Sequence, residues 1–314
     1  MFRFRFLGFV LTLVIHCAAT ESFYVPVSND TWETERNFFK EHGYLWIKDF
    51  FSDEQVVLLK KWAEEINSAS QNILFLSKTS SLSLQDLAKR IPQSPIVVPE
   101  AGDPNLVCRA EDISSSFAGL YHFMMGTVTE YIGRLLGEPH VLFKDKINFK
   151  WPGGGAFLPH QDYPAYELLG ARAHVTAMIS IDLATLDNGC LQIAHGWKES
   201  LMGEPNVDGE ELAQGRAVLP FAIGGPEHGS IQPTLCAKMN WLPLKTSPRD
   251  LVIFDSFLPH YSEPNHSNHS RRAMFFTHNR LAEGDFRTAY YYAKRQDPDN
   301  PIFHIGTPTK ARTK

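Results

Sequence analysis

The feature that most constrains the fold is a change from helical to strand periodicity near Val141. Before it, apolar residues recur at helical spacing, as Val56, Leu59, Trp62, Ala63 and Ile66 do. After it, the residues of 144–151 alternate, with apolar Ile147, Phe149 and Trp151 between polar Lys146, Asn148 and Lys150. Helices followed by many short strands favour an α+β fold, mainly β, in which one polar face lines a wet site.

The N-terminal part is predicted to be scaffold. We expect a helix from Thr31 to a stop at Gly43, a strand over 44–47, and a capping box of Ser52 and Gln55 that starts the next helix. Residues 68–105 are rich in Ser and Pro and predict a loop that holds a short helix over 84–90. A further amphipathic helix is expected over 115–136.

The C-terminal half predicts strands joined by turns. Alternate residues of 174–183 are apolar, so that one face should hold Val175, Ala177, Ile179, Ile181 and Leu183. Further strands are expected over 190–196, 241–244, 250–257 and 271–279. Residues 196–245 form a long insertion rich in Gly and Pro, which predicts a lid. Residues 283–295 should cap the strands, and residues 306–314 predict a mobile tail.

The first twenty residues predict a secretory signal peptide. Arg3 and Arg5 precede an apolar run over 6–15 that is too short to span a bilayer, and small residues follow it. The rest, 21–314, is then expected to be a single domain in the endoplasmic reticulum or outside the cell. If the run has no targeting value, a cytoplasmic location is expected. Sequons at Asn29, Asn265 and Asn268 are compatible with secretion.

Composition narrows the function further. The 314 residues carry a net charge of −5 without a basic block, so nucleic-acid binding is not expected and a stable membrane anchor is not either. With a cleaved signal, Cys108, Cys190 and Cys236 remain, and an odd number leaves at least one thiol free. The sequence leaves the oligomeric state open.

His160 and Asp162 are the first candidate site residues. On an extended strand, residues two apart point to the same side, so one imidazole and one carboxylate converge on one point. With a distant second histidine, these are the ligands of the 2-His-1-carboxylate site that holds non-haem Fe(II). Because the chain has 13 histidines, such a pair also arises by chance. A turn cap or a surface pair is the alternative for these two residues alone.

Later motifs give the pair a context. His260 lies just past a predicted strand in Pro-His-Tyr-Ser-Glu-Pro-Asn (259–265), and Arg271 opens Arg-Arg-Ala-Met-Phe-Phe-Thr-His-Asn (271–279). Together with His-Gln-Asp at 160–162 and the opening segment 38–56, this set resembles the phytanoyl-CoA dioxygenase family over residues 35–295. The resemblance implies a double-stranded β-helix, or jelly roll, with N-terminal and flanking helices. It also implies an Fe(II)/2-oxoglutarate-dependent dioxygenase.

The resemblance implies roles for individual residues. His160, Asp162 and His260 would be the iron ligands, and Arg271 would pair with the far carboxylate of 2-oxoglutarate beside Ser262. Strand parity separates Arg271 from Arg272, and the small Ala273 and Thr277 beside Arg271 favour Arg271. Lys150 or Asn148 is a further candidate for a cosubstrate contact.

The implied reaction is a hydroxylation. 2-Oxoglutarate and dioxygen would be the cosubstrates, with ascorbate in support, and the retained Asp162 favours oxygen transfer over halogenation. Segments 259–265, 271–279 and 283–295 are similar to a branch that acts on small polar molecules such as 2-aminoethylphosphonate. An acyl-CoA 2-hydroxylase and a catalytically inactive jelly-roll metal- or ligand-binding module are the alternatives.

Overall fold

The computed structural model describes residues 32–167, 170–222, 229–298, 303 and 308–309. The predicted signal peptide and the sequon at Asn29 lie outside these residues, so both stay predictions. No helix within the described ranges is long and apolar enough to cross a membrane.

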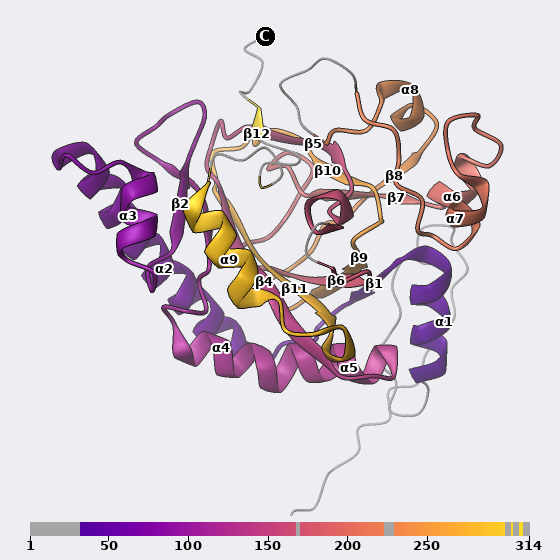
Figure 1. Ribbon diagram of the computed structural model, residues 1–314, viewed down its shortest axis with the longest axis horizontal. Helices are drawn as coiled ribbons and strands as arrows, with labels where there is room; N and C mark the ends of the chain where they lie inside the picture. Colours follow the sequence, from indigo (N-terminus) through magenta and orange to yellow (C-terminus); the bar gives the residue numbers. More distant parts are fainter. Residues whose placement is uncertain (1–31, 168–169, 223–228, 299–302, 304–307, 310–314) are drawn as a thin grey trace, which may run out of the picture.

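Two antiparallel sheets form the body of the molecule (Figure 1). The larger sheet has seven strands in the order β1 (Tyr44–Ile47), β9 (Leu251–Asp255), β6 (His174–Ser180), β11 (Arg271–Arg280), β4 (His140–Lys150), β3 (Val107–Glu111) and β2 (Ile96–Pro99). The smaller sheet has five in the order β12 (Pro308–Thr309), β5 (Ala156–His160), β10 (His260–Ser262), β7 (Leu191–His195) and β8 (Asn240–Pro243). This is the predicted jelly-roll arrangement, with helices added outside it.

Helices cover the outer face of the larger sheet. They are α1 (Trp32–His42), α2 (Asp53–Thr79), α4 (Ala118–Met124), the π-helix η1 (Met125–Thr129) and α5 (Glu130–Leu136). The capping box is present, since Gln55 N donates to Ser52 Oγ and Ser52 N donates to the Gln55 side chain. Alternate strand residues such as Val175, Ala177 and Ile179 pack against these helices in one core. The faces predicted from alternation are therefore the buried ones.

The inner face of the larger sheet meets the smaller sheet, and its polarity changes from the β1 side to the β3 side. Near β1 and β9 it is apolar, with Tyr44, Met178 and Phe254 packed on Leu191 and Ile193. On β4 and β3 it is charged. Register places Lys146 opposite Glu111 and Asn148 opposite Arg109, and all of these residues but half-buried Lys146 are buried. Such a half-polar interior is the setting of a site.

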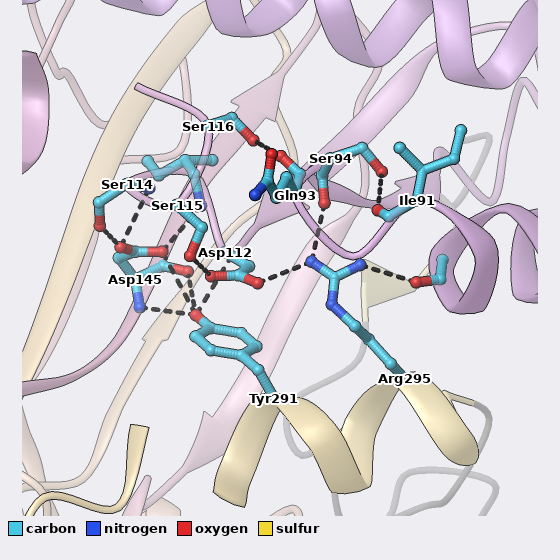
Figure 2. Close-up of polar contacts among 12 residues, drawn as sticks. Ile91, Gln93, Ser94, Asp112, Ser114, Ser115, Ser116, Asp145, Tyr291 and Arg295 are labelled. Carbon is cyan, nitrogen blue, oxygen red and sulfur yellow. Dashed lines mark hydrogen bonds and ion pairs between the residues drawn. The ribbon is translucent and has the colours of Figure 1, made fainter. Parts of the chain in front are cut away.

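The helix α9 (Arg287–Gln296) closes the open side of β4 (Figure 2). Tyr291 Oη donates to Asp145 O and accepts from Asp145 N, each at 2.8 Å. Arg295 donates to Asp112 Oδ2 at 2.6 Å and to the carbonyls of Ala88 and Ser94. The predicted capping segment thus becomes a helix tied to a strand and to two loops.

Several predicted boundaries are wrong. Residues 68–79 continue α2 rather than forming a loop, because Ile73 and Leu74 keep the helical spacing and pack on the core. Residues 96–99 are the strand β2. The strand β6 ends at Ser180, and Leu183 is 61% exposed, since the chain leaves the sheet before it.

The long insertion has structure of its own. It contains α6 (Trp197–Ser200), α7 (Gly209–Ala213) and α8 (Pro233–Cys236), and its Leu212 and Leu219 join the core between the sheets. Its role as a lid stays a prediction. Within the predicted tail, Pro308–Thr309 pairs with β5, and the neighbouring residues lie outside the described ranges.

The thiols and sequons also have definite surroundings. Cys108, Cys190 and Cys236 are all free, and the first two are buried.

Asn265 is 1% exposed and its amide donates to Lys150 O at 3.0 Å and His269 O at 2.7 Å. A glycan on Asn265 would break both hydrogen bonds, so this sequon is a structural turn in the folded protein.

Candidate metal and cosubstrate site

Three side chains converge between the sheets. His160 ends β5, His260 begins β10 directly opposite it, and Asp162 begins the short 3-10 helix η2 (Tyr163–Ala165). Their ligand atoms lie within 4.8 Å of one another, and all three residues are buried. Two imidazoles and one carboxylate at this spacing form a set that suits Fe(II) and leaves coordination positions open.

Both imidazoles are oriented by the backbone in the same way. Each follows a Leu-Pro pair, and its Nδ1 lies within hydrogen-bond distance of the leucine carbonyl, at 2.6 Å for Leu158 O and 2.9 Å for Leu258 O. A carbonyl only accepts, so Nδ1 carries the proton and Nε2 keeps its lone pair. This is the tautomer that a metal ligand needs, so both imidazoles fit the role of metal ligand.

The charge states agree with this role. Burial, with His260 nearby, lowers the pKa of His160 to about 3, and burial also lowers the pKa of His260. Burial alone would raise the pKa of Asp162, but the neighbouring His260, Lys146 and His160 lower it to about 2. At neutral pH the site therefore presents two neutral imidazoles and one carboxylate.

A cavity extends from the two histidines toward β11. Its lining comes from both sheets: Lys146, Asn148, Lys150, Phe157, His160, Leu191, His260, Tyr261, Ser262, Arg271 and Phe275. At its far end Arg271 is 4% exposed, donates to Gly189 O and has an Nε without a partner among the described residues. Lys150 Nζ donates to Ser262 Oγ at 2.8 Å and to Glu263 O. Three basic residues, Lys146, Lys150 and Arg271, thus face a space that has no carboxylate in its lining.

Arg271 and Arg272 have different surroundings, as strand parity predicts. Arg272 points to the outer side, where it makes two hydrogen bonds to Asp182 at 2.8 and 2.9 Å and an ion pair with Glu64. Its charge is therefore satisfied by other side chains. Arg271 alone lies in the cavity.

Gly189 makes room for the cationic end of the cavity. It has φ +73°, and a Cβ there would lie 2.3 Å from Glu263 O and 3.0 Å from Lys150 Nζ. The Asp-Asn-Gly turn was predicted from sequence, but this close approach to Lys150 was not. Only glycine satisfies both the backbone angle and the space.

Three residues next to the metal ligands in the sequence, Gln161, Tyr163 and Tyr166, make structural contacts. Gln161 points away from the metal ligands: its Nε2 donates to Ala217 O and Phe257 O, and its Oε1 accepts from Leu219 N. It therefore ties the insertion to the strand that carries the ligands. Tyr163 stacks on Phe257 at 4.1 Å. Tyr166 is buried between Phe143 and His174 rather than exposed to a cavity of the described residues.

Lys144 is a buried polar residue that the sequence reasoning passed over. It lies two residues from Lys146 on the same face of β4 and is 7% exposed. The strand alternation that marked Lys146, Asn148 and Lys150 extends to it and was a sufficient signal. His278, on the opposite face of its strand from Thr277, is fully buried with Nε2 at 2.8 Å from Thr129 Oγ1.

Comparison with known protein sequences gives consistent matches. A sequence model of the phytanoyl-CoA dioxygenase family matches residues 39–273. A 2-aminoethylphosphonate dioxygenase of uncultured bacterium HF130_AEPn_1 is 35% identical over 268 residues, which cover 84% of this chain and 87% of the relative. A methylphosphonate hydroxylase of Gimesia maris is 32% identical over 265 residues, which cover 84% and 86%.

Solved structures share the fold. EctD from S. alaskensis, crystallised with 2-oxoglutarate and 5-hydroxyectoine, has a TM-score of 0.60 at 18% identity and covers 82% of this chain and 79% of its own. The epimerase SnoN, crystallised with Fe3+, alpha ketoglutarate and nogalamycin RO, has a TM-score of 0.56 at 13% identity and covers 91% and 98%. At these identities the likeness concerns the architecture.

Proposed function

The chain belongs to the phytanoyl-CoA dioxygenase family, and on that premise we propose that it is an Fe(II)- and 2-oxoglutarate-dependent dioxygenase that hydroxylates a small phosphonate. The observation that carries the proposal is the buried cluster of His160, Asp162 and His260 at one end of a cavity that holds Arg271 at the other. A metal end and a cationic end in one enclosed space match a cosubstrate with a carboxylate at each end.

The three ligands would hold Fe(II), because Nε2 of both imidazoles is free and Asp162 is ionised. Bound there, the metal would supply the oxidative chemistry: 2-oxoglutarate loses carbon dioxide and becomes succinate, while one oxygen atom of dioxygen enters a C–H bond of the substrate. The protein orients both reactants and excludes water from them.

Arg271 would hold the far carboxylate of 2-oxoglutarate. Its guanidinium is buried, and its Nε has no partner among the residues described. Ser262 would share that carboxylate, and Lys150 would hold Ser262 in place through its hydrogen bond to Oγ. Burial and the neighbouring Arg271 lower the pKa of Lys150 well below its ordinary value, so Arg271 is the cation of this end. Burial lowers the pKa of Arg271 to about 10, so the guanidinium is still charged at neutral pH and lacks only a counter-ion.

The names of the two relatives above, which are matched over most of their length, support a phosphonate as the substrate. An acyl-CoA substrate, as the name of the family suggests, is the alternative within the same chemistry. A jelly-roll module that binds a metal or ligand without turnover is the other alternative.

The test is a turnover assay with the purified protein, Fe(II), ascorbate and 2-oxoglutarate. We expect succinate, and with 2-aminoethylphosphonate a product heavier by one oxygen atom. Asp162→Ala should form neither. Product from phytanoyl-CoA and none from phosphonates would favour the acyl-CoA alternative, whereas metal binding without succinate from any substrate would favour the inactive module.

A further inference from the structure

The inner face of β4 carries a row of polar side chains that crosses the whole site. Lys150, Asn148, Lys146 and Lys144 point the same way, and successive members are about 7 Å apart along the strand. Lys150 lies beside Arg271 at one end, and Lys146 lines the cavity beside His160 and His260. Lys144 is one step farther, past the metal ligands. The row therefore extends beyond the part of the cavity, between the metal ligands and Arg271, that 2-oxoglutarate would occupy.

The other cations of this interior have partners. Glu111 Oε2 accepts from Lys294 Nζ at 2.6 Å, and Glu111 Oε1 lies 2.7 Å from Arg109 Nε. Lys150 is held by Ser262 Oγ and Glu263 O. Each of these ammonium or guanidinium groups is satisfied within the protein or assigned to the cosubstrate.

Lys144 and Lys146 differ from them. Neither makes a hydrogen bond or an ion pair with the described residues, and their contacts are with aromatic rings. Lys144 Nζ lies 5.3 Å from the ring centroid of Tyr166 and 5.6 Å from that of Tyr290. Glu111 and Asp162 act on both ammonium groups only from beyond ion-pair distance. A buried ammonium without a direct ion pair is costly, which indicates that an anion neutralises it in the working protein.

Two further residues with unpartnered polar atoms belong to, or pack on, the aromatic rings that Lys144 contacts. Tyr290 is fully buried, and its Oη has no hydrogen-bond partner among the described residues. His174 packs on Tyr166 at 4.8 Å, is fully buried, and lacks a partner at both ring nitrogens within the described part of the chain. Donors that converge without protein acceptors are what a bound oxyanion requires.

From these observations we propose that Lys144, with Lys146 beside it, binds the dianionic head group of the primary substrate on the side of the metal ligands opposite to Arg271. The inference rests on the proposed function and adds the residues that select a phosphonate over a carboxylate. Two ammonium groups and nearby hydroxyl and imidazole donors match a head group with three oxygens and two negative charges. A carboxylate would leave one of the two charges without a partner.

The experiment measures binding without turnover. The Fe(II)–2-oxoglutarate complex of the protein is titrated by calorimetry in the absence of dioxygen, with methylphosphonate or acetate as the probe, and 2-oxoglutarate binding is measured separately. We expect methylphosphonate to bind at least tenfold more tightly than acetate. Lys144→Met should weaken the binding of methylphosphonate at least 30-fold and the binding of 2-oxoglutarate less than threefold. Exposed Lys60→Met, which removes the same charge from the surface, should change neither.

Each other outcome has a definite meaning. The inference is overturned if Lys144→Met binds methylphosphonate as tightly as the wild type does, or if it loses affinity for methylphosphonate and 2-oxoglutarate equally. It is also overturned if the wild type binds acetate as tightly as methylphosphonate. If the wild type binds neither Fe(II) nor 2-oxoglutarate, the proposed function itself fails. If circular dichroism shows that Lys144→Met is unfolded, Lys146→Met takes its place with the same expected weakening.

Discussion

His160 and His260 face each other across the β5–β10 pair, with ring centroids 4.2 Å apart. Each occupies the third position of a Leu-Pro-His segment, and each Nδ1 bonds to the carbonyl two residues before it. Because that bond is local, neither tautomer depends on a distant partner. The geometry of the metal site is therefore set by two short segments and one strand pairing.

Metal binding should stabilise the wild type and not Asp162→Ala. A divalent ion at 100 times its dissociation constant adds about 2.7 kcal/mol to the free energy of unfolding. For a domain of this size that corresponds to a rise in Tm of about 4 °C. Thermal melts with Fe(II) under nitrogen, and with a chelator, measure the difference. An equal rise in the Tm of Asp162→Ala would mean that the metal binds outside the site of His160, Asp162 and His260.

Arg271→Ala and Arg272→Ala should separate cosubstrate binding from stability. Loss of the buried guanidinium of Arg271 should raise the KM for 2-oxoglutarate about 30-fold or more, from a loss of at least about 2 kcal/mol. Arg272→Ala removes contacts to Asp182 and Glu64 only, so we expect an unchanged KM and a loss of about 1 kcal/mol in stability. The reverse pattern would assign 2-oxoglutarate to Arg272.

Gly189→Ala should impair both folding and cosubstrate binding. Its Cβ would meet Glu263 O at 2.3 Å and Lys150 Nζ at 3.0 Å. Gly203 is a matched control because it has φ +81° and open space around its Cβ position. Both substitutions should cost about 1–2 kcal/mol from backbone angle, and Gly189→Ala about 1–3 kcal/mol more from crowding. Urea denaturation compares them, and equal losses would contradict the crowding argument.

Gln161→Leu should loosen the insertion. It leaves Ala217 O, Phe257 O and Leu219 N without their partner, at about 1 kcal/mol or more for each buried group. Gln161→Glu keeps an acceptor for Leu219 N but sets a buried carboxylate oxygen against Ala217 O and Phe257 O, so it should cost at least as much as Gln161→Leu. Hydrogen exchange at the Leu219 amide reports the loss directly. An unchanged exchange rate in Gln161→Leu would mean that the insertion is held by its apolar contacts alone.

Asp255 should make stability depend on pH. Burial raises its pKa to about 7 in the folded protein, whereas the unfolded chain releases the proton near pH 4. Between these values the folded state binds more protons, so the free energy of unfolding falls as the pH rises. Because the side chain is partly exposed, the loss should be a part of the ~4 kcal/mol that three pKa units represent. Asp255→Asn should remove this slope between pH 5 and 7.5, and an identical slope in both proteins would contradict it.

The sequence predicts the local features of the fold well. Periodicity locates α1, β1 and the two faces of β4, and the capping box locates the start of α2. Strand parity also separates the surroundings of Arg271 and Arg272. Each of these depends only on residues a few positions apart.

Features that depend on distant contacts were not predictable in this way. The continuation of α2 through Ser-rich residues requires the core to hold Ile73 and Leu74. The insertion is packed because Gln161 and the core between the sheets bind it. Lys294 lies in the segment that was predicted only to cap the strands, and its burial to 1% exposure depends on Glu111, which is far away in the sequence.

The contact between Lys294 and Glu111 spans 183 positions of the chain. Until α9 leaves the ribosome, Glu111 has no ion pair other than that with Arg109, and the backbone of Asp145 on β4 lacks its hydrogen bonds to Tyr291. Synthesis therefore delivers the charged interior before the segment that completes it. A nascent chain halted before Arg287 would already hold the metal ligands and the residues that line the cavity. Glu111 and Asp112 would still lack the cations that α9 supplies, so we expect this side of the molecule to be completed last.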